Sequence, residues 1–128
     1  MRLTVKTDYC LRVLIYLQKQ KTKVKIQQIA DEYHVSKNHL SVAVNALSEL
    51  GYVLSTSGPH GGIEFNPQFA EKTVGELISK LEDLNIVECM TEEGNCVITG
   101  HCRLKGMLKK ANVAFLNELK KYQIKDLT

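Results

Sequence analysis

Residues 26–51 carry the feature that most constrains the fold, because they combine two short helical patterns with a tight junction. Apolar side chains share one face over residues 26–33, and Ser36 is a favourable N-terminal cap for a second apolar run. Gly51 ends that run, as a residue free to adopt a positive φ should. The small Ala30 allows the second helix to cross the first closely. These residues therefore predict a helix-turn-helix.

Elements on both sides of this motif extend it to a larger unit. Before it, residues 7–20 repeat apolar side chains at three- and four-residue intervals, which predicts an amphipathic helix capped by Thr7. After it, the strand-like residues 52–55 and 63–65 flank a turn-rich, glycine-containing connection, which predicts a β-hairpin. A hairpin directly after a helix-turn-helix is a wing. The order of elements predicts a mainly helical, winged helix-turn-helix fold with a small β-hairpin.

The C-terminal part of the chain has a different character. Residues 73–76 fit a capping box that opens a further helix, and apolar residues recur at three- and four-residue intervals over residues 103–122. A monomer of this size would struggle to cover such a seam, so we expect a long C-terminal dimerisation helix, with a helix packed only on its own chain as the alternative. We divide the chain into a winged helix-turn-helix region, 1–72, and a cysteine-containing loop with the dimerisation helix, 73–128. The seam consists of Leu104, Leu108, Ala111, Phe115, Leu119 and Tyr122.

Length and charge exclude several classes of protein. The chain has 128 residues, 44% of them hydrophobic, which suits one domain. No apolar run approaches the roughly 20 residues that span a bilayer, and the charged start lacks a signal peptide's apolar stretch, so we expect a cytoplasmic protein. The net charge of +3 arises in the first 65 residues. The lysine-rich residues 19–25 are interpreted as a solvated loop, or alternatively as a phosphate-contacting edge.

The polar positions of the second motif helix are candidates for contacting DNA. They are not used by the apolar stripe, so we expect them to face the major groove, where asparagine can read adenine and the helix N-terminus can hold phosphate. The hairpin connection offers only His60, which is largely neutral near pH 7, so more of the binding would rest on the helix. The candidate DNA-binding residues are Ser36, Lys37, Asn38, His39, Ser41, Asn45 and His60.

Three cysteines lie close together in the sequence, as Cys89, Cys96 and Cys102 in the pattern C-x6-C-x5-C. In a cytosolic chain such a cluster favours metal or redox chemistry over structural disulfides, and the spacing is not that of a zinc finger. Three thiolates without a fourth nearby cysteine indicate either an iron–sulfur cluster with one unusual ligand or a zinc site completed by another group. His101 adjoins a cysteine and would point away from it, and Cys10 is interpreted as a small core residue.

Together these motifs resemble the NsrR type of nitric-oxide-sensing iron–sulfur repressors and, more distantly, their relative IscR. The resemblance is carried by the opening R-L-T-x-x-T-D-Y-x-L-R, the segment I-A-x-x-Y-x-V-S-K-N-H-L, the glycine-rich hairpin and the cysteine spacing. It implies that Cys89, Cys96 and Cys102 hold a cluster, [4Fe–4S] rather than [2Fe–2S]. It also implies that Asp8 of the partner subunit completes the coordination. The position of the IscR-type histidine ligand is Lys105 here, which argues against that branch.

The resemblance implies a function as well: a homodimeric DNA-binding repressor, not an enzyme, whose operator affinity depends on the cluster and whose signal is nitric oxide. A carboxylate is a hard, weak ligand among soft thiolates, so the iron bound by Asp8 would be the most open to exchange. Without the resemblance, Asp8 is a first-turn carboxylate that complements the helix dipole, and Arg12 can pair with it when no cluster is bound. Two other classes remain open: a zinc- or thiol-redox-based regulator, and a winged-helix interaction module that does not bind DNA.

Overall fold

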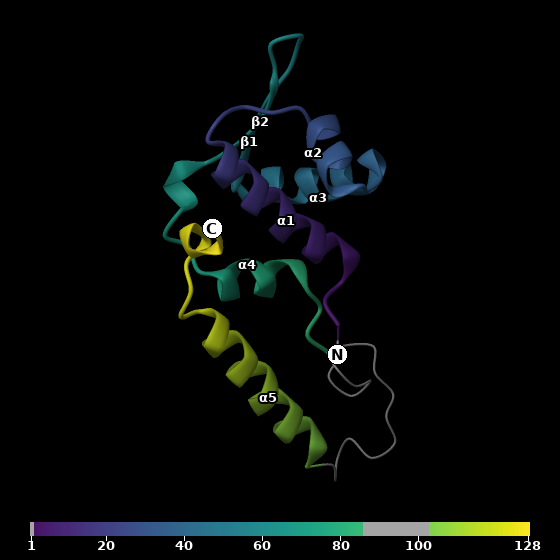
Figure 1. Cartoon of the computed structure of the whole chain (residues 1–128). Coiled ribbons are helices and arrows are strands. Elements are labelled where there is room, and N and C mark those ends of the chain that lie inside the picture. The colour runs from purple at the N-terminus through teal and green to yellow at the C-terminus, as the bar shows by residue number, and fades with distance from the viewer. Residues whose placement is uncertain (1, 86–102) are drawn as a thin grey trace.

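The structure is a computed structural model that describes residues 2–85 and 103–128. Three helices and a two-stranded antiparallel hairpin form one end of the molecule, and a long helix extends from the other end (Figure 1). This arrangement confirms the predicted mainly helical fold with a hairpin wing. No helix in the described ranges is both long and apolar enough to cross a bilayer. The elements are α1 (Val5–Gln20), α2 (Ile26–Tyr33), α3 (Lys37–Leu50), β1 (Val53–Thr56), β2 (Gly62–Phe65), the 3-10 helix η1 (Pro67–Phe69), α4 (Val74–Leu81), α5 (Leu104–Leu119) and the 3-10 helix η3 (Ile124–Leu127).

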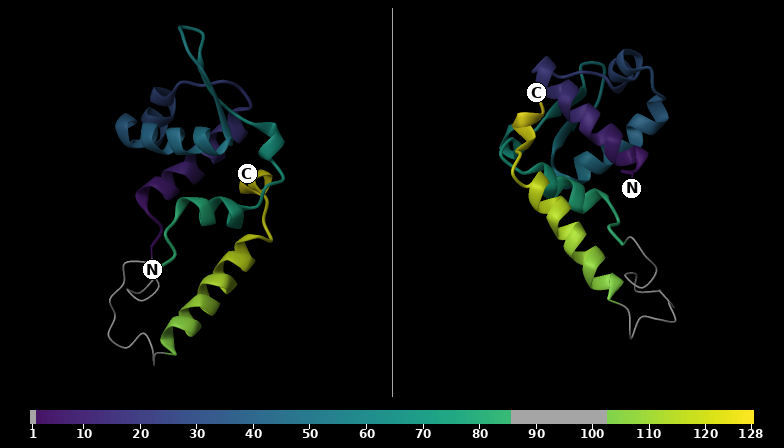
Figure 2. Two further views of the ribbon diagram at one scale, coloured as in Figure 1. Left: turned by 180° about the vertical axis from the view of Figure 1, so that it is seen from behind. Right: turned by 60° about the horizontal axis from the view of Figure 1, so that its bottom comes forward.

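Helix α1 lies at the centre of the molecule, with α3 and the hairpin on one side and α4 on the other (Figures 1 and 2). Its predicted apolar face is buried, as Val13 and Leu14 are fully covered. Cys10 belongs to the same buried cluster, and its thiol lies 3.5 Å from the carbonyl oxygen of Ala43 in α3. Burial raises the pKa of the Cys10 thiol to about 12, so it stays protonated. The interpretation of Cys10 as a core residue is confirmed.

The N-terminal cap of α1 is Thr4, so the expectation that Thr7 caps this helix is wrong. The Thr4 hydroxyl accepts a hydrogen bond from the Thr7 backbone N–H at 3.3 Å. Thr7 is fully buried inside the first turn, and its own hydroxyl donates to the carboxylate of Glu82 at 2.5 Å. Both threonines are good caps by residue type. Glu82, 75 residues from Thr7, accepts hydrogen bonds from both of them, and Thr4 is the one that lies outside the helix.

The helix-turn-helix has the predicted junctions. Helix α2 ends at His34, which adopts the left-handed conformation with φ 54°, and α3 ends at Gly51 with φ 94°. A Cβ atom at position 51 would lie 2.8 Å from the ring of Phe69, so packing as well as conformation favours glycine there. Ser36 occupies the cap position of α3, but its side chain makes no capping hydrogen bond and is exposed.

The lysine-rich segment before α2 is attached to the hairpin. Val24 and Ile63 exchange two backbone hydrogen bonds, of 2.9 and 2.7 Å, and both side chains are buried. The expectation of a solvated loop therefore holds for the exposed lysines of residues 19–25 but not for Val24. Segments about 40 residues apart in sequence thus lie side by side.

Helix α5 is divided between its own chain and solvent. Its C-terminal half packs on α4, where Phe115, Leu116 and Leu119 join the core. After the helix the chain returns to α1, so that Ile124 is fully buried. At the other end Leu104 is 47% and Met107 is 61% exposed. The predicted seam is thus covered at one end by its own chain and left open at the other, and Tyr122 lies beyond the end of the helix.

Glu82, directly after α4, holds the start of α1. Its carboxylate accepts hydrogen bonds from the Thr4 N–H at 3.1 Å, the Thr4 hydroxyl at 2.7 Å and the Thr7 hydroxyl at 2.5 Å. Partial burial alone would raise the pKa of Glu82, but the bonds from Thr7 and Thr4 and the charge of Lys6 lower it below its ordinary value of 4.5. We call this set of contacts between Glu82, Thr4 and Thr7 the Glu82 latch.

The Glu82 latch predicts a specific dependence of stability on pH. Because the pKa of Glu82 is lower in the folded state, its contribution is complete above pH 4.5 and is lost as the pH falls through the folded-state pKa. Glu82→Gln should lower the free energy of unfolding at pH 7 by about 1 kcal/mol, since it replaces charge-assisted hydrogen bonds with neutral ones. Chemical denaturation of both proteins between about pH 7 and pH 3 measures the difference, which should shrink toward acid.

The matched control is Glu118→Gln, because that carboxylate is exposed and pairs with Lys121, three residues further along the chain and beyond the end of α5. It should change stability little at any pH. A difference between wild type and Glu82→Gln that is absent at pH 7, or that grows in acid, would contradict this account of the latch.

Candidate functional site

Helix α3 presents the polar face that the sequence predicts. Its apolar residues Leu40, Ala43 and Leu47 are buried against α1, so the remaining side of the helix faces solvent. Ser41 is half-buried, and its hydroxyl donates to the Lys37 carbonyl oxygen at 2.9 Å. The candidate residues that are exposed are Ser36, Lys37, Asn38, His39 and Asn45. These five candidates are accessible, and the ring of His39 lies 6.4 Å, centroid to centroid, from the ring of Tyr9 in α1.

A groove of about 450 Å³ lies between α3, the start of α2 and the hairpin. Lys37 and Asn45 line it from α3, whereas His60 lies in the turn at the hairpin tip and is exposed. The groove therefore joins two of the candidate DNA-binding residues to the stem of the hairpin, but not to its tip. The other polar residues that line it were not listed among the DNA-binding candidates, although the alternative interpretation of residues 19–25 as a phosphate-contacting edge includes the first of them: Lys25, Gln27, Ser55 and Thr56.

No local signal would have placed these residues beside α3. The alternation of a strand shows that Ser55 and Thr56 point to opposite sides of β1, but it does not show which side faces the helix. Lys25 reaches the groove because Val24 pairs with β2, a contact between segments far apart in sequence.

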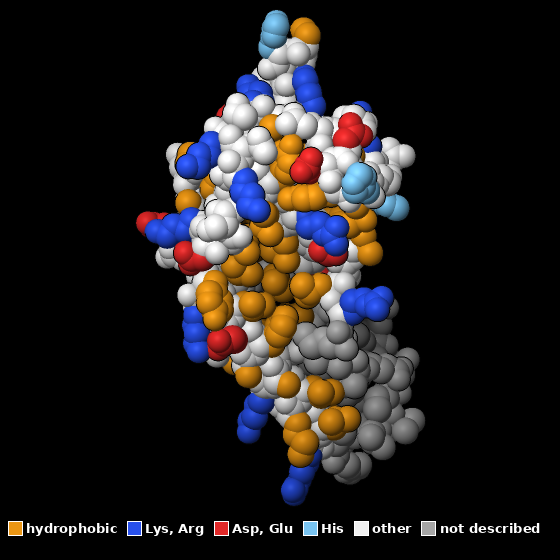
Figure 3. Space-filling model, in the orientation of Figure 1, with side chains coloured by type: hydrophobic (Ala, Val, Ile, Leu, Met, Phe, Trp, Pro, Cys, Tyr) orange, Lys and Arg blue, Asp and Glu red, His pale blue; other side chains and the backbone are white. Residues whose placement is uncertain are grey.

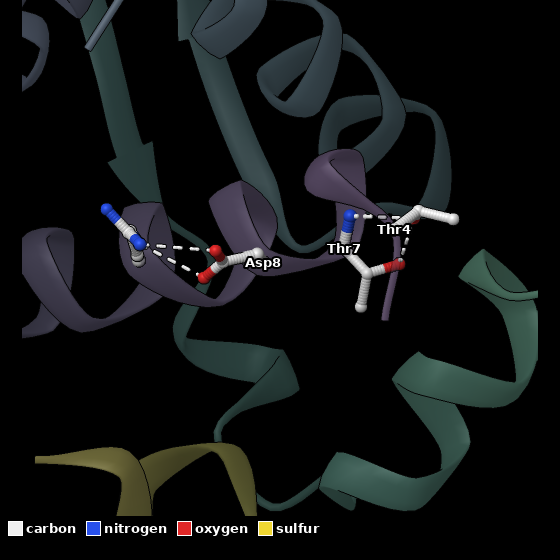
Figure 4. A network of polar contacts seen from close by, with 4 residues as sticks. Thr4, Thr7 and Asp8 are labelled. Carbon is white, nitrogen blue, oxygen red and sulfur yellow. Dashed lines mark hydrogen bonds and ion pairs between the residues drawn. The ribbon is translucent and has the colours of Figure 1, made fainter. Parts of the chain in front are cut away.

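Asp8, the predicted ligand from the first helix, is paired with Arg12. The two side chains make two parallel contacts, from Arg12 Nε to Oδ1 at 3.0 Å and from Arg12 Nη2 to Oδ2 at 3.1 Å (Figure 4). They are 49% and 43% exposed, so the pair lies on the surface of α1. The predicted pairing of Arg12 with Asp8 is confirmed. Figure 4 also shows that Asp8 lies beside Thr4 and Thr7, the residues held by the Glu82 latch.

The three predicted cysteine ligands, Cys89, Cys96 and Cys102, and the neighbouring His101 lie outside the described residues. Within residues 2–85 and 103–128, no three His, Cys, Asp or Glu side chains converge to form a metal site. The ligand set therefore stays a prediction.

The described residues nearest to the cysteine segment in sequence are anchored at two points. The Glu82 latch fixes the chain to α1, and the Leu84 carbonyl oxygen accepts a hydrogen bond of 2.5 Å from the Asn112 side chain in α5. Asn112 is buried despite its polarity, which this bond explains. The sequence analysis missed both Glu82 and Asn112, because neither belongs to a motif. A polar residue at a buried helical position was the only available signal for Asn112.

An apolar groove of about 390 Å³ opens between α1, α4 and the end of α5. Leu11, Ile78 and Phe115 are among its walls. Figure 3 shows that hydrophobic side chains form a broad patch on this face of the molecule, with further hydrophobic side chains along the lower part of the molecule, where α5 lies in Figure 1. This face is the largest apolar surface visible in that view.

Comparison with known proteins identifies relatives over nearly the whole chain. The Rrf2 family model, described as an iron-dependent transcriptional regulator, matches residues 3–128. The HTH-type transcriptional regulator NsrR of Bacillus subtilis is 44% identical over 99% of this chain and 90% of its own length. The protein of the same name from Shouchella clausii is 42% identical over 99% of this chain and 88% of its own length.

Solved structures support the fold. The crystal structure of Staphylococcus aureus CymR in its oxidized form has a TM-score of 0.75 at 23% identity, covering 99% of this chain and 95% of that one. T. potens IscR has a TM-score of 0.72 at 19% identity, covering 99% and 85% respectively. At these identities the likeness concerns the fold alone. The family match and the identity to the two regulators carry the assignment: the chain belongs to the Rrf2 family of transcriptional regulators, which are not enzymes.

Proposed function

We propose that this protein is a cytoplasmic, homodimeric DNA-binding repressor whose operator affinity is controlled by an iron–sulfur cluster that responds to nitric oxide. In this proposal residues 1–72 bind DNA, and residues 73–128 hold the sensor loop and the dimerisation helix. The observation that carries DNA binding is the groove shared by α3 and the hairpin, because Lys37 and Asn45 there combine a cation with a base-reading amide. The signal, nitric oxide, is what the resemblance to the NsrR type of repressors implies.

DNA reading would be divided among the exposed residues of α3. Asparagine can donate to and accept from adenine in the major groove, so Asn38 and Asn45 are proposed to contact bases. Ser36 and Lys37 at the N-terminus of α3 would hold phosphate, which fixes the position of the helix on the duplex. His39, Ser41 and His60 complete the proposed contact set, with Ser41 limited by its bond to the Lys37 carbonyl oxygen.

Two substitutions distinguish these roles. Asn38→Ala should lower discrimination between operator and random DNA by about 1–3 kcal/mol, since it removes a base contact. Lys37→Ala should weaken binding to all duplexes alike and reduce the slope of log affinity against log salt by about 1 per phosphate contact. Anisotropy titrations with an operator fragment, selected by binding from genomic DNA, and with a random duplex give both quantities. Unchanged binding in both variants would show that α3 is not the reading helix.

Dimerisation through α5 is proposed because one end of its apolar seam packs on its own chain, whereas the other end is exposed to solvent. Its N-terminal half exposes Leu104 and Met107, which lie one turn apart on the same side of the helix, and the apolar groove lies near its other end. Contiguous apolar surfaces of this kind mark interaction sites. A second copy of the chain is the proposed occupant, because a two-fold axis pairs two α3 helices for successive turns of one duplex.

The dimer is tested by the molar mass in solution. Light scattering at micromolar concentration should give the mass of two chains for the wild type. Replacing both Leu104 and Met107 with Glu should give the mass of one chain, because four carboxylates would otherwise be buried at the interface. Leu54→Glu is the matched control, since Leu54 is 45% exposed on the hairpin, away from α5. A wild-type monomer, or a charged α5 that still dimerises, would contradict the proposed interface.

The proposed cluster ligands are Cys89, Cys96, Cys102 and Asp8 of the partner subunit, and a [4Fe–4S] cluster is favoured. The donor set suits iron–sulfur chemistry, because thiolates are soft ligands and the Asp8 carboxylate is accessible on the surface of α1. When bound, the cluster would supply the site at which nitric oxide reacts.

The chain's own residues would convert the state of this site into DNA affinity. Asp8 cannot be fully engaged by Arg12 and by iron, so ligation would release the Arg12 guanidinium, and loss of ligation would restore the pair seen here. Asp8 belongs to the first turn of α1, which packs directly on α3. A restraint on the start of α1 would therefore reach the reading helix α3. When that restraint is lost, the two α3 helices of the dimer would no longer be held at the spacing that matches the duplex.

The switch is tested with cluster-loaded protein purified without oxygen. Cys89→Ala, Cys96→Ala and Cys102→Ala should each abolish the visible absorption of the cluster, its iron and sulfide, and operator binding. Asp8→Ala should act more mildly, because water or a thiol can take its place. Cys10→Ala is the matched control, since Cys10 is a core residue, and it should keep the cluster.

Operator affinity is then measured before and after stoichiometric nitric oxide. It should fall after the reaction. Equal affinity in the two states, or cysteine variants that bind the operator as well as the wild type, would show that the cluster is not the switch. Zinc without acid-labile sulfide in the purified protein would point instead to the zinc- or thiol-based regulator.

A further inference from the structure

The hairpin lacks the cations that a wing would use on DNA. Its connection, residues 57–61, contains no lysine or arginine, and His60 is its only ionisable side chain. The hairpin nevertheless projects from the molecule beside the exposed face of α3 (Figures 1 and 2). A hairpin in that position would meet the phosphates of any duplex that α3 reads. Cations that neutralise those phosphates would have to come from another segment of the chain.

The segment that precedes α2 lies against the hairpin and brings two lysines to it. The paired backbone groups of Val24 and Ile63 form an isolated antiparallel bridge, which holds residues 23–25 against β2. A Cβ atom on Gly62 would lie 2.5 Å from the Val24 carbonyl oxygen and 3.0 Å from Lys23 Cγ. The glycine therefore allows this backbone, and the stem of the Lys23 side chain, to approach β2 closely.

Lys25 extends the contact toward the tip. Its ammonium group donates to the Gly58 carbonyl oxygen at 3.1 Å, inside the hairpin connection. An ammonium has three donors, so two remain for another acceptor. Lys25 also lines the groove that contains Lys37 and Asn45. One side chain thus connects the hairpin connection with the face of α3 that is proposed to read DNA.

These lysines form no ion pair with another described residue. None of the ion pairs between residues of the described ranges includes Lys23, Lys25 or Lys37, and all three are exposed. The carboxylate of Asp31 in α2 pairs with none of these lysines and instead accepts a hydrogen bond from the Gln27 side chain at 2.7 Å. Figure 3 shows Lys or Arg side chains beside the stem of the projecting hairpin.

We propose that Lys23 and Lys25 are the wing's cations: they neutralise phosphates of the operator backbone beside the hairpin, a role that the hairpin's own sequence cannot supply. This inference rests on the proposed DNA-binding function. The inference goes beyond that function because it assigns phosphate contacts to a segment before the helix-turn-helix. Because phosphate contacts do not depend on base sequence, the two lysines should contribute equally to operator and non-operator binding.

The experiment uses the full chain and a fluorescein-labelled 30-base-pair duplex of random sequence, titrated between about 50 and 200 mM KCl. The variants are Lys23→Gln, Lys25→Gln and the double variant, with Lys25→Arg to keep the charge. Lys80→Gln is the matched control, because it removes the same charge from α4, on the other side of α1 from the hairpin. Thermal unfolding of every variant checks that the exposed substitutions leave the fold intact.

Each lost phosphate contact should reduce the slope of log affinity against log salt by about 0.9 per bound protomer, so the double variant should lose about twice as much as either single variant. Lys25→Arg and Lys80→Gln should keep the wild-type slope. A double variant with the wild-type slope, or a control that loses as much, would overturn the inference while leaving DNA binding intact. A wild type that binds neither this duplex nor any genomic fragment would overturn DNA binding and the inference with it.

Discussion

Burial of the apolar face of α1 is the constraint on which the rest of the structure depends. Leu14 and Leu17 are covered by neighbours, and each such side chain contributes about 1.5–3 kcal/mol when removed from water. Helix α1 contacts α3, β2, α4 and η3, so both parts of the chain pack on one helix. Removing it would leave the helix-turn-helix and the C-terminal helices without a shared core.

The same helix carries the proposed sensor residue on its other side. Because α1 is held by its buried face, Asp8 is fixed relative to α3 without belonging to the proposed DNA-binding surface. The ion pair of Asp8 with Arg12 is half-exposed, and such pairs contribute only about 0–1 kcal/mol. A coupling free energy of 1.4 kcal/mol already changes affinity tenfold. The pair is therefore weak enough to be given up when Asp8 gains another partner.

The Glu82 latch and Asn112 attach the described residues that precede the cysteine segment to this frame. Glu82 binds the first turn of α1, and Asn112 binds the backbone at Leu84 from α5. The chain that leads to the proposed ligands is thereby attached to the helix that carries Asp8 and to the helix proposed for dimerisation.

The sequence by itself determined the elements and their order. The three- and four-residue repeats of α1 and α3, the positive φ of Gly51 and the turn residues before Gly62 act over a few residues, so local patterns were sufficient to predict them. The pairing of Arg12 with Asp8 was predictable for the same reason, since the two are one helical turn apart.

Only the tertiary structure decided where distant segments meet. Glu82 binds both Thr4 and Thr7 at the start of α1, and the chain returns after α5 to bury Ile124, which no sequence pattern had indicated. Lys25 reaches the groove of α3 through the pairing of Val24 with β2. Each of these outcomes depends on contacts across 39 to more than 100 residues, which hydrophobic burial and hydrogen-bond satisfaction select in the folded chain and which no local periodicity records.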